Sequence, residues 1–260
     1  MSQTRPLAVV TGASSGIGLE LAKLCAEAGH DLLLAADRPL DQAKAELGGT
    51  AVETVQADLA TPEGVDKLLS ALGERPVAIL CANAGHGLGK AFLDEEWPAV
   101  RHVIDTNITG TVYLLHKVGQ RMRRAGQGKI LVTGSIAGYQ AQPFQAVYHG
   151  SKAFVDLFTI ALREEVKAHG IVVTLLMPGA TETEFFDRAG MQDTKLGESK
   201  KADPADVAKT GFDALMRGDA DVVHGLGNKV MTAVADLLPS SLTARMAANQ
   251  ARPGSGKQSA

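Results

Sequence analysis

The stretch Leu7–Gly18, LAVVTGASSGIG, joins a short apolar run to a turn with glycines at positions 12, 16 and 18. A segment with helical periodicity follows as far as Ala28. Glycines after a strand let the backbone approach a pyrophosphate closely, and the N-terminus of the next helix offers free N–H groups and a partial positive charge. The spacing G-x-x-x-G-x-G differs from the usual G-x-G-x-x-G fingerprint, and a plain tight turn is the alternative interpretation. The stretch predicts the first strand and helix of an α/β fold, with a candidate phosphate-binding turn between them.

Apolar runs and helical segments alternate along the rest of the chain. Further strands are predicted at residues 31–36, 51–56, 77–81, 129–133, 171–176 and 221–223. Because these strands are nearly continuous apolar runs separated by helices, they indicate a parallel sheet covered by helices on both faces. Helices are predicted to begin at Thr61-Pro62 and Asp203-Pro204, where a capping side chain precedes a proline of the first turn. The long helical region 97–125 contains Asn107, an amide in an otherwise apolar segment. Asn107 is a candidate site residue, and a simple capped or kinked position is the alternative interpretation.

Length and composition restrict the class of protein. The chain has 260 residues, 45% of them hydrophobic, which predicts one domain over residues 1–250. A net charge of -3 gives no electrostatic reason to expect a nucleic-acid partner. Cys25 and Cys81 offer no metal-ligand spacing, so we expect buried thiols in a reducing compartment and no metal. Without a signal peptide or an apolar run of ~18 residues, the protein is expected to be cytoplasmic, with no membrane partner. The tail 251–260, ARPGSGKQSA, is predicted to be disordered.

Tyr148 and Lys152, in the segment YHGSK, lie four residues apart and share one face of a helix. A free phenol has a pKa near ~10, and a nearby ammonium lowers that pKa because it stabilises the phenolate. Lowering the pKa to about 7 needs roughly 4 kcal/mol. One close ammonium in a partly desolvated cleft, helped by a cationic cofactor ring, is of that order. The pair is a candidate for proton transfer, and a surface phenol beside a solvated lysine is the alternative.

The chain resembles the short-chain dehydrogenase/reductase family in its short, single-domain form, over roughly residues 5 to 225. The resemblance rests on TGASSGIG, Asn83-Ala84-Gly85, Asn107, Ser135 and Tyr148-x-x-x-Lys152 in this order. It implies a doubly wound Rossmann-type parallel sheet of about seven strands in the order 3-2-1-4-5-6-7, with helices on both faces. It also implies an NAD(P)-dependent oxidoreductase that interconverts a secondary alcohol and a ketone or aldehyde by hydride transfer.

The resemblance assigns roles to individual residues. Tyr148 is implied as the general acid/base, and Ser135 as the hydroxyl that holds the substrate oxygen. Lys152 is implied to lower the tyrosine pKa and to bind the nicotinamide ribose, while Asn107 holds a water that relays protons. The implied cofactor-binding residues are Gly12, Ser14, Ser15, Ile17, Gly18, Asp37, Arg38, Asp58, Leu59, Asn83, Ala84, Gly85, Tyr148, Lys152, Pro178, Gly179, Thr181 and Thr183.

The choice of coenzyme depends on Asp37, at the end of the second predicted strand, and on Arg38 beside it. An acidic residue at this place accepts hydrogen bonds from the adenosine ribose and repels a 2′-phosphate. Arg38 can instead clamp a phosphate. The commonest NAD pattern of the family has the acid one residue earlier, at Ala36, and NADP-preferring members often carry a basic residue at the position of Asp37. We expect NAD as the cofactor, with NADP as the alternative.

The stretch 183–203 mixes Phe185, Phe186 and Met191 with charged residues and glycines. In the family such a stretch is a mobile lid over the substrate, which excludes water from the reaction. A short helix packed on the body is the alternative, and nothing in the sequence identifies the substrate. In relatives the long helices around Asn107 and Tyr148 form the interface of dimers and tetramers, so a homo-oligomer, such as a homotetramer, is expected by analogy.

Two other functions stay open at this point. A nicotinamide-binding regulator without turnover would be expected to have lost Tyr148 or Lys152, and both are present. A lyase or epimerase on the same fold would use the tyrosine without net redox change.

Overall fold

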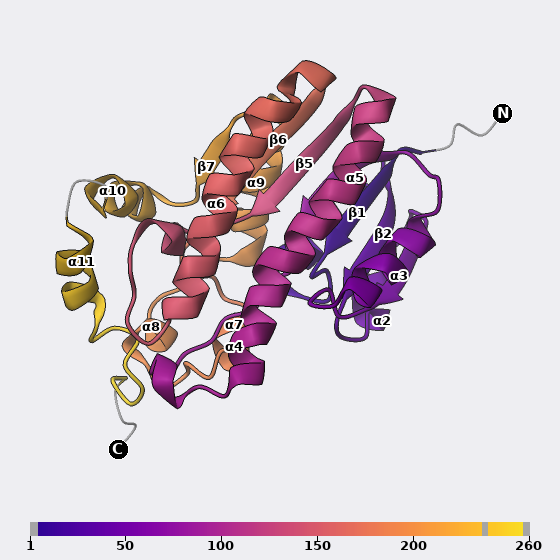
Figure 1. Ribbon diagram of the computed structural model, residues 1–260. Coiled ribbons are helices and arrows are strands. Elements are labelled where there is room, and N and C mark those ends of the chain that lie inside the picture. The colour runs from indigo at the N-terminus through magenta and orange to yellow at the C-terminus, as the bar shows by residue number, and fades with distance from the viewer. Residues whose placement is uncertain (1–4, 236–238, 257–260) are drawn as a thin grey trace.

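Seven strands form one parallel sheet in the computed structural model, which describes residues 5–235 and 239–256 (Figure 1). Their order is β3-β2-β1-β4-β5-β6-β7, which confirms the predicted doubly wound topology. Strand β1 pairs with β2 on one side and with β4 on the other, so the chain reverses its direction of winding beside β1. The strands are β1 (Leu7–Thr11), β2 (Asp31–Ala36), β3 (Val52–Gln56), β4 (Val77–Ala82), β5 (Gly128–Thr133), β6 (Ile171–Met177) and β7 (Asp221–Val223).

Helices cover both faces of the sheet, as the apolar strands predicted. Within β2, Leu33 packs into one core layer, while Leu32 and Leu34 pack into the other, and each is at most 1% exposed. Figure 1 shows α5 and α6 in front of the sheet and α9 behind it. The first core layer receives α3 (Pro62–Leu72), α5 (Thr111–Ala125) and α6 (Ala146–Val166), and the second receives α1 (Gly16–Glu27), α2 (Asp41–Glu46) and α9 (Pro204–Arg217).

The predicted helix starts are confirmed. The Thr61 hydroxyl caps α3 by accepting a hydrogen bond from the Gly64 amide at 3.0 Å. The Asp203 carboxylate caps α9 by accepting one from the Ala205 amide at 2.7 Å. Each of these helices has a proline in its first turn, where the missing N–H costs no helical hydrogen bond.

The predicted helical region 97–125 contains one irregular turn. It consists of α4 (Trp97–Ile104), a π-helical segment η2 (Asp105–Gly110) and α5. Asn107 lies within the π segment and is 1% exposed. A π turn inside an α-helix is often found at a functional site because it re-aims one side chain.

The C-terminal region differs from the predicted disordered tail. Helices α10 (Leu226–Ala235) and α11 (Ser240–Ala247) lead to residues 251–256, which pack against the body. Ala251 is fully buried in a small cluster with Phe186 and Met191, and the Arg252 guanidinium lies 5.8 Å from the centre of the Phe144 ring. The prediction is wrong for these six residues, because the apolar surface that covers Ala251 comes from distant parts of the chain. Residues 257–260 lie outside the described residues.

Both cysteines are free and buried, as predicted. Among the described residues, no helix combines the length and the apolar character needed to cross a membrane.

Candidate active site

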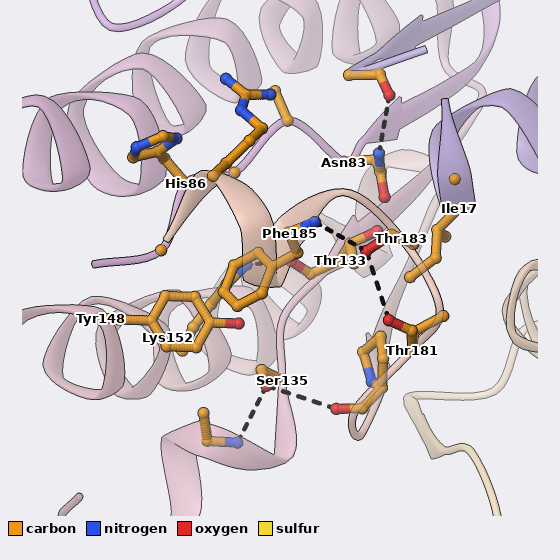
Figure 2. Close-up of a pocket in the computed structure, with 18 of the residues that line it drawn as sticks. Ile17, Asn83, His86, Thr133, Ser135, Tyr148, Lys152, Thr181, Thr183 and Phe185 are labelled. Carbon is orange, nitrogen blue, oxygen red and sulfur yellow. Dashed lines mark hydrogen bonds between the residues drawn. The ribbon is translucent and has the colours of Figure 1, made fainter. Parts of the chain in front are cut away.

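A cleft of about 300 Å³ opens at the carboxyl edge of the sheet (Figure 2). Parallel strands end at the same edge, so the loops after β1, β2, β4, β5 and β6 meet there. Gly18, Arg38 and Asn107 belong to the predicted site but not to the lining of the cleft. The other predicted site residues all line it: Gly12, Ser14, Ser15, Ile17, Asp37, Asp58, Leu59, Asn83, Ala84, Gly85, Ser135, Tyr148, Lys152, Pro178, Gly179, Thr181 and Thr183.

The glycine turn after β1 is a close-packed cradle. Gly12 and Gly16 have φ angles of 63° and 55°, in the left-handed region that favours glycine. A Cβ on Gly18 would lie 2.1 Å from the carbonyl oxygen of Gly12, so a side chain there would collide with the backbone. Gly18 therefore lets α1 start directly against the turn, although it does not itself face the cleft. This backbone fits a pyrophosphate at the helix N-terminus.

Asn83 fixes the glycine turn to the end of β4. The Thr11 hydroxyl accepts hydrogen bonds from the backbone amides of Asn83 and Ala84, both at 3.0 Å. The Asn83 side-chain amide donates to the Thr11 carbonyl at 3.2 Å. Asn83 was predicted to bind the cofactor, and the structure adds that its side chain holds two loops of the cleft together.

Tyr148 projects from α6 toward Ser135, which follows β5 (Figure 2). Burial raises the pKa of the Tyr148 phenol to about 12, the nearby Ser135 hydroxyl partly opposes this shift, and the negative charge of Asp156 adds to it. The Ser135 hydroxyl is held in place by two contacts, since it accepts from the Ala137 amide at 3.1 Å and donates to the Pro178 carbonyl at 3.4 Å. Tyrosine and serine thus present two hydroxyls to one point of the cleft.

Lys152 lies one turn after Tyr148 on the same face of α6, as its spacing predicted. Its ammonium donates to the Thr133 carbonyl at 2.8 Å and lies 6.0 Å from the centre of the tyrosine ring. Burial lowers the pKa of Lys152 to about 8, while Asp156 opposes that shift. Burial thus raises the Tyr148 pKa while the ammonium bonds to a carbonyl, and the expected lowering of this pKa by Lys152 together with a cationic cofactor ring stays a prediction.

Asn107 holds the walls of the cleft rather than lining it. Its side-chain oxygen accepts from the His86 amide at 2.8 Å. Its NH₂ group donates to the His86 carbonyl and to the Ser151 hydroxyl, both at 2.9 Å. The π turn of η2 thus joins the loop after β4 to α6, and the predicted proton-relay water of Asn107 stays a prediction.

Asp156 is a buried carboxyl behind the site that the sequence reasoning missed. Its Oδ1 accepts from the Ser135 amide at 3.3 Å, and its Oδ2 has no hydrogen-bond partner among the described residues. Burial raises the pKa of Asp156 to about 7, and Lys152 partly opposes this. A signal was available, since Asp156 follows Lys152 by four residues and shares its helix face.

The stretch 183–203, which we call the lid, is a loop whose two ends pair, and its closure over a substrate stays a prediction. Thr181 and Ala202 form an isolated bridge at its base, and the loop carries α7 (Phe185–Arg188) and α8 (Lys195–Glu198). The Phe185 ring lies 5.0 Å from the Tyr148 ring, centre to centre, so the lid reaches the proposed reaction centre (Figure 2). Both of its helices are short, as the alternative interpretation expected.

Two lid residues also contact Asp37 and Arg38, the pair that was predicted to select the coenzyme. Arg188 donates to the Asp37 carboxylate at 2.5 Å, and Arg38 donates to the Glu184 carboxylate at 2.7 Å. Glu184 and Arg188 line the cleft, and sequence reasoning did not single them out. No local pattern connects residues that lie about 150 positions apart.

Comparison with known proteins agrees with this geometry. A family model described as short chain dehydrogenase matches residues 6–194. An uncharacterised oxidoreductase of Staphylococcus saprophyticus is 33% identical over 218 residues, which cover 81% of this chain and 91% of that protein. An uncharacterised oxidoreductase of Myxococcus xanthus is 32% identical over 241 residues, covering 90% and 93%.

Solved structures give the same result. A short-chain dehydrogenase from Sphingobium yanoikuyae in complex with NADPH has a TM-score of 0.79 and 30% identity, covering 89% of this chain and 94% of that one. A bulky-bulky ketone specific alcohol dehydrogenase from Comamonas testosteroni has a TM-score of 0.76 and 25% identity, covering 90% and 94%. The family model spans the glycine turn, Ser135, Tyr148 and Lys152. The chain belongs to the short-chain dehydrogenase/reductase family and is an oxidoreductase with a Rossmann-type fold.

Proposed function

We propose that the protein interconverts an alcohol and a ketone or aldehyde with a nicotinamide coenzyme, and that Tyr148 is the general acid/base. The observation that carries the proposal is that the hydroxyl side chains of Ser135 and Tyr148 line the same cleft as the glycine turn (Figure 2). Two hydroxyls that converge beside an anion-binding helix N-terminus suit a carbonyl oxygen next to a dinucleotide.

The two hydroxyls have separate tasks in the reduction of a carbonyl. When bound, the coenzyme supplies or accepts the hydride, and its oxidised ring adds a positive charge to the site. Ser135 orients the substrate oxygen and stabilises the negative charge that develops on it. Tyr148 donates its proton to the same oxygen, and a phenol with a raised pKa holds that proton at neutral pH. In the oxidation of an alcohol, Tyr148 takes the proton from the substrate oxygen.

Lys152 supplies a positive charge next to Tyr148 during this proton transfer. Its ammonium is buried and fixed to the Thr133 carbonyl, within 6.0 Å of the Tyr148 ring centre. A positive charge at this distance stabilises a phenolate more strongly in a buried site than in water. Lys152 would therefore act together with the charge of the oxidised coenzyme, and it would bind the nicotinamide ribose.

The cofactor-binding proposal follows the shape of the cleft. Gly12, Ser14, Ser15 and Ile17 would hold the pyrophosphate, and the segment 178–183 would hold the nicotinamide carboxamide. At the adenosine end Asp37 favours NAD over NADP, because its carboxylate can accept from the ribose hydroxyls and repel a 2′-phosphate. NADPH in the relative from Sphingobium yanoikuyae supports the choice of a nicotinamide coenzyme without deciding between the two.

The remaining expectations belong to the same proposal. We expect a cytoplasmic homo-oligomer, and apolar side chains exposed on α6 and α4 support an interface there. Leu157 is 76% exposed, Trp97 63% and Phe154 44%. Light scattering of the purified protein measures the oligomeric state, and a monomer at micromolar concentration would contradict this part.

A titration of the purified protein with NADH, and separately with NADPH, tests the function directly. Enhanced nicotinamide fluorescence with tighter NADH is the expected result. The oxidised coenzymes should then be reduced with members of a panel of secondary alcohols, including the alcohols of bulky ketones because of the relative from Comamonas testosteroni. Failure of both coenzymes to bind would overturn the proposal.

A further inference from the structure

Two ion pairs cross the adenosine end of the cleft. Arg188 of α7 pairs with Asp37 at 2.5 Å, and Glu184, the residue before α7, pairs with Arg38 at 2.7 Å. The side chains are between 26% and 51% exposed, so solvent reaches both pairs. Each pair joins the loop after β2 to the lid.

The charges match in a crossed arrangement. Asp37 and Arg38 are neighbours of opposite sign, and Glu184 and Arg188 are one helical turn apart, since the Arg188 amide donates to the Glu184 carbonyl at 2.9 Å. The negative Glu184 of the lid therefore faces the positive Arg38, and the positive Arg188 of the lid faces the negative Asp37. Each lid residue neutralises one of the two residues that are proposed to select the coenzyme.

Glu184 also marks where an anion is favoured. Its Oε2 accepts from the Arg38 guanidinium at 2.7 Å and from the Ser15 hydroxyl at 3.3 Å. Ser15 is the N-cap residue of α1, and its side chain makes no capping bond. A carboxylate held by a guanidinium and a hydroxyl at a helix N-terminus occupies a place that suits a phosphate oxygen.

We propose that the lid residues Glu184 and Arg188 determine coenzyme specificity by competing for Arg38 and Asp37. This inference rests on the proposed nicotinamide-dependent function. Arg188 neutralises Asp37, which weakens the repulsion of a 2′-phosphate and so tolerates NADPH. Glu184 occupies Arg38, which withholds the natural partner of that phosphate and so disfavours NADPH. Selection between NADH and NADPH then depends on four residues, two of which belong to the lid.

Charge-neutral variants of similar size test the two halves separately. Arg188→Gln exposes the charge of Asp37, so the ratio Kd(NADPH)/Kd(NADH) should rise about fivefold, the size of one exposed ion pair. Glu184→Gln releases Arg38, so the ratio should fall about fivefold. Arg188→Lys keeps the charge and should stay within about twofold of the wild type. Dissociation constants come from nicotinamide fluorescence titrations at low salt.

The background Asp37→Asn distinguishes masking from direct contact. If Arg188 acts by neutralising Asp37, Arg188→Gln leaves the ratio unchanged in that background. If Arg188→Gln lowers NADPH affinity equally in the wild type and in the Asp37→Asn background, Arg188 binds the 2′-phosphate itself. That result would overturn the proposal that Arg188 acts by neutralising Asp37. A ratio that neither variant moves in the wild-type background overturns the inference as a whole.

Asp187→Asn is the matched control. Asp187 lies on the same short helix but pairs with Gln192, and it does not line the cleft. Its removal should leave the ratio within about twofold, because it contacts neither Asp37 nor Arg38. An equal shift in this control would attribute the effect to lid charge in general and overturn the specific pairing.

The titrations also separate this inference from the proposed function. Binding of neither coenzyme to the wild type overturns both. Binding of both coenzymes with a ratio that the lid variants do not move keeps the proposed function and overturns this inference. Binding with shifts of opposite sign in Arg188→Gln and Glu184→Gln supports both.

Discussion

The cleft has a floor, formed by the loops at the carboxyl ends of the strands, and a lid, formed by residues 183–203. Buried contacts to the backbone hold the floor, whereas partly exposed ion pairs and a small apolar cluster hold the lid. In the floor, the Thr11 hydroxyl binds two backbone amides of the loop after β4, and Gly18 admits no side chain. In the lid, Arg188 and Glu184 reach the loop after β2 through partly exposed side chains. The difference indicates that the fold fixes the floor more firmly than the partly exposed ion pairs fix the lid.

The largest effect is expected at Tyr148, where floor and lid meet. Tyr148→Phe removes the proposed proton donor, and turnover should fall about 10³-fold or more, while coenzyme binding survives. Steady-state kinetics and a coenzyme titration measure the two effects. Tyr113→Phe is the matched control, because the Tyr113 hydroxyl donates to Asp66 outside the cleft. Unchanged turnover in Tyr148→Phe would remove the general acid/base assignment.

The pH dependence of stability tests whether burial raises the pKa of Asp156 behind the cleft. A carboxyl whose folded pKa is raised from 3.8 to about 7 stabilises the fold at low pH, and this stability is lost as the pH rises through that range. Asp156→Asn cannot titrate, so the free energy of unfolding of the variant should rise relative to that of the wild type between pH 4 and 8, by up to about 4 kcal/mol. Urea unfolding at several pH values measures the gain. A constant difference across that range would contradict the raised pKa.

Gly18→Ala tests the close backbone packing of the floor. The added Cβ would lie 2.1 Å from the Gly12 carbonyl oxygen, so we expect a loss of about 2 to 3 kcal/mol in unfolding free energy and weaker coenzyme binding. Gly119→Ala in α5 is the control, because nothing lies within 4 Å of its Cβ position, and it should gain up to about 1 kcal/mol. Thermal and urea unfolding report both values. Equal behaviour of the two variants would show that the glycine turn adapts.

The smallest effect is expected from the lid itself. Phe185→Leu removes the ring that packs against Tyr148, and the value of kcat/KM should fall about fivefold, the size of one aromatic pair. The global unfolding free energy should change by less than about 1 kcal/mol, because the lid packs in a cluster separate from the two sheet layers. Phe92→Leu, at an exposed ring outside the cleft, is the control. If Phe185→Leu lowered the global unfolding free energy but left kcat/KM unchanged, the lid would be part of the folded core and not of the reaction site.

The predicted part of the site consists of residues whose role depends on local sequence. The glycine turn, Ser135 after β5 and the Tyr148–Lys152 spacing are all contiguous patterns, and all of them line the cleft except Gly18. Asn107 was predicted as a site residue, but the π turn that directs its side chain toward His86 and Ser151 was not. Helical periodicity alone does not distinguish an α turn from a π turn.

The residues that escaped prediction depend on packing between distant segments. Arg188 and Glu184 meet Asp37 and Arg38 only because the lid folds back over the loop after β2. Residues 251–256 are ordered because Ala251 enters a cluster with Phe186 and Met191.

The sequence by itself determined the strand order through a family resemblance, the helix starts through their caps, and the residues at the carboxyl edge of the sheet. The helix starts and the residues at the strand ends follow from periodicity and from side chains close together in the chain, whereas the strand order is what the resemblance implied. Only the tertiary structure decided the pKa directions of Tyr148, Lys152 and Asp156 and the contacts of the lid. Desolvation and long-range ion pairing depend on which distant atoms surround a group, and that is known only once the chain is packed.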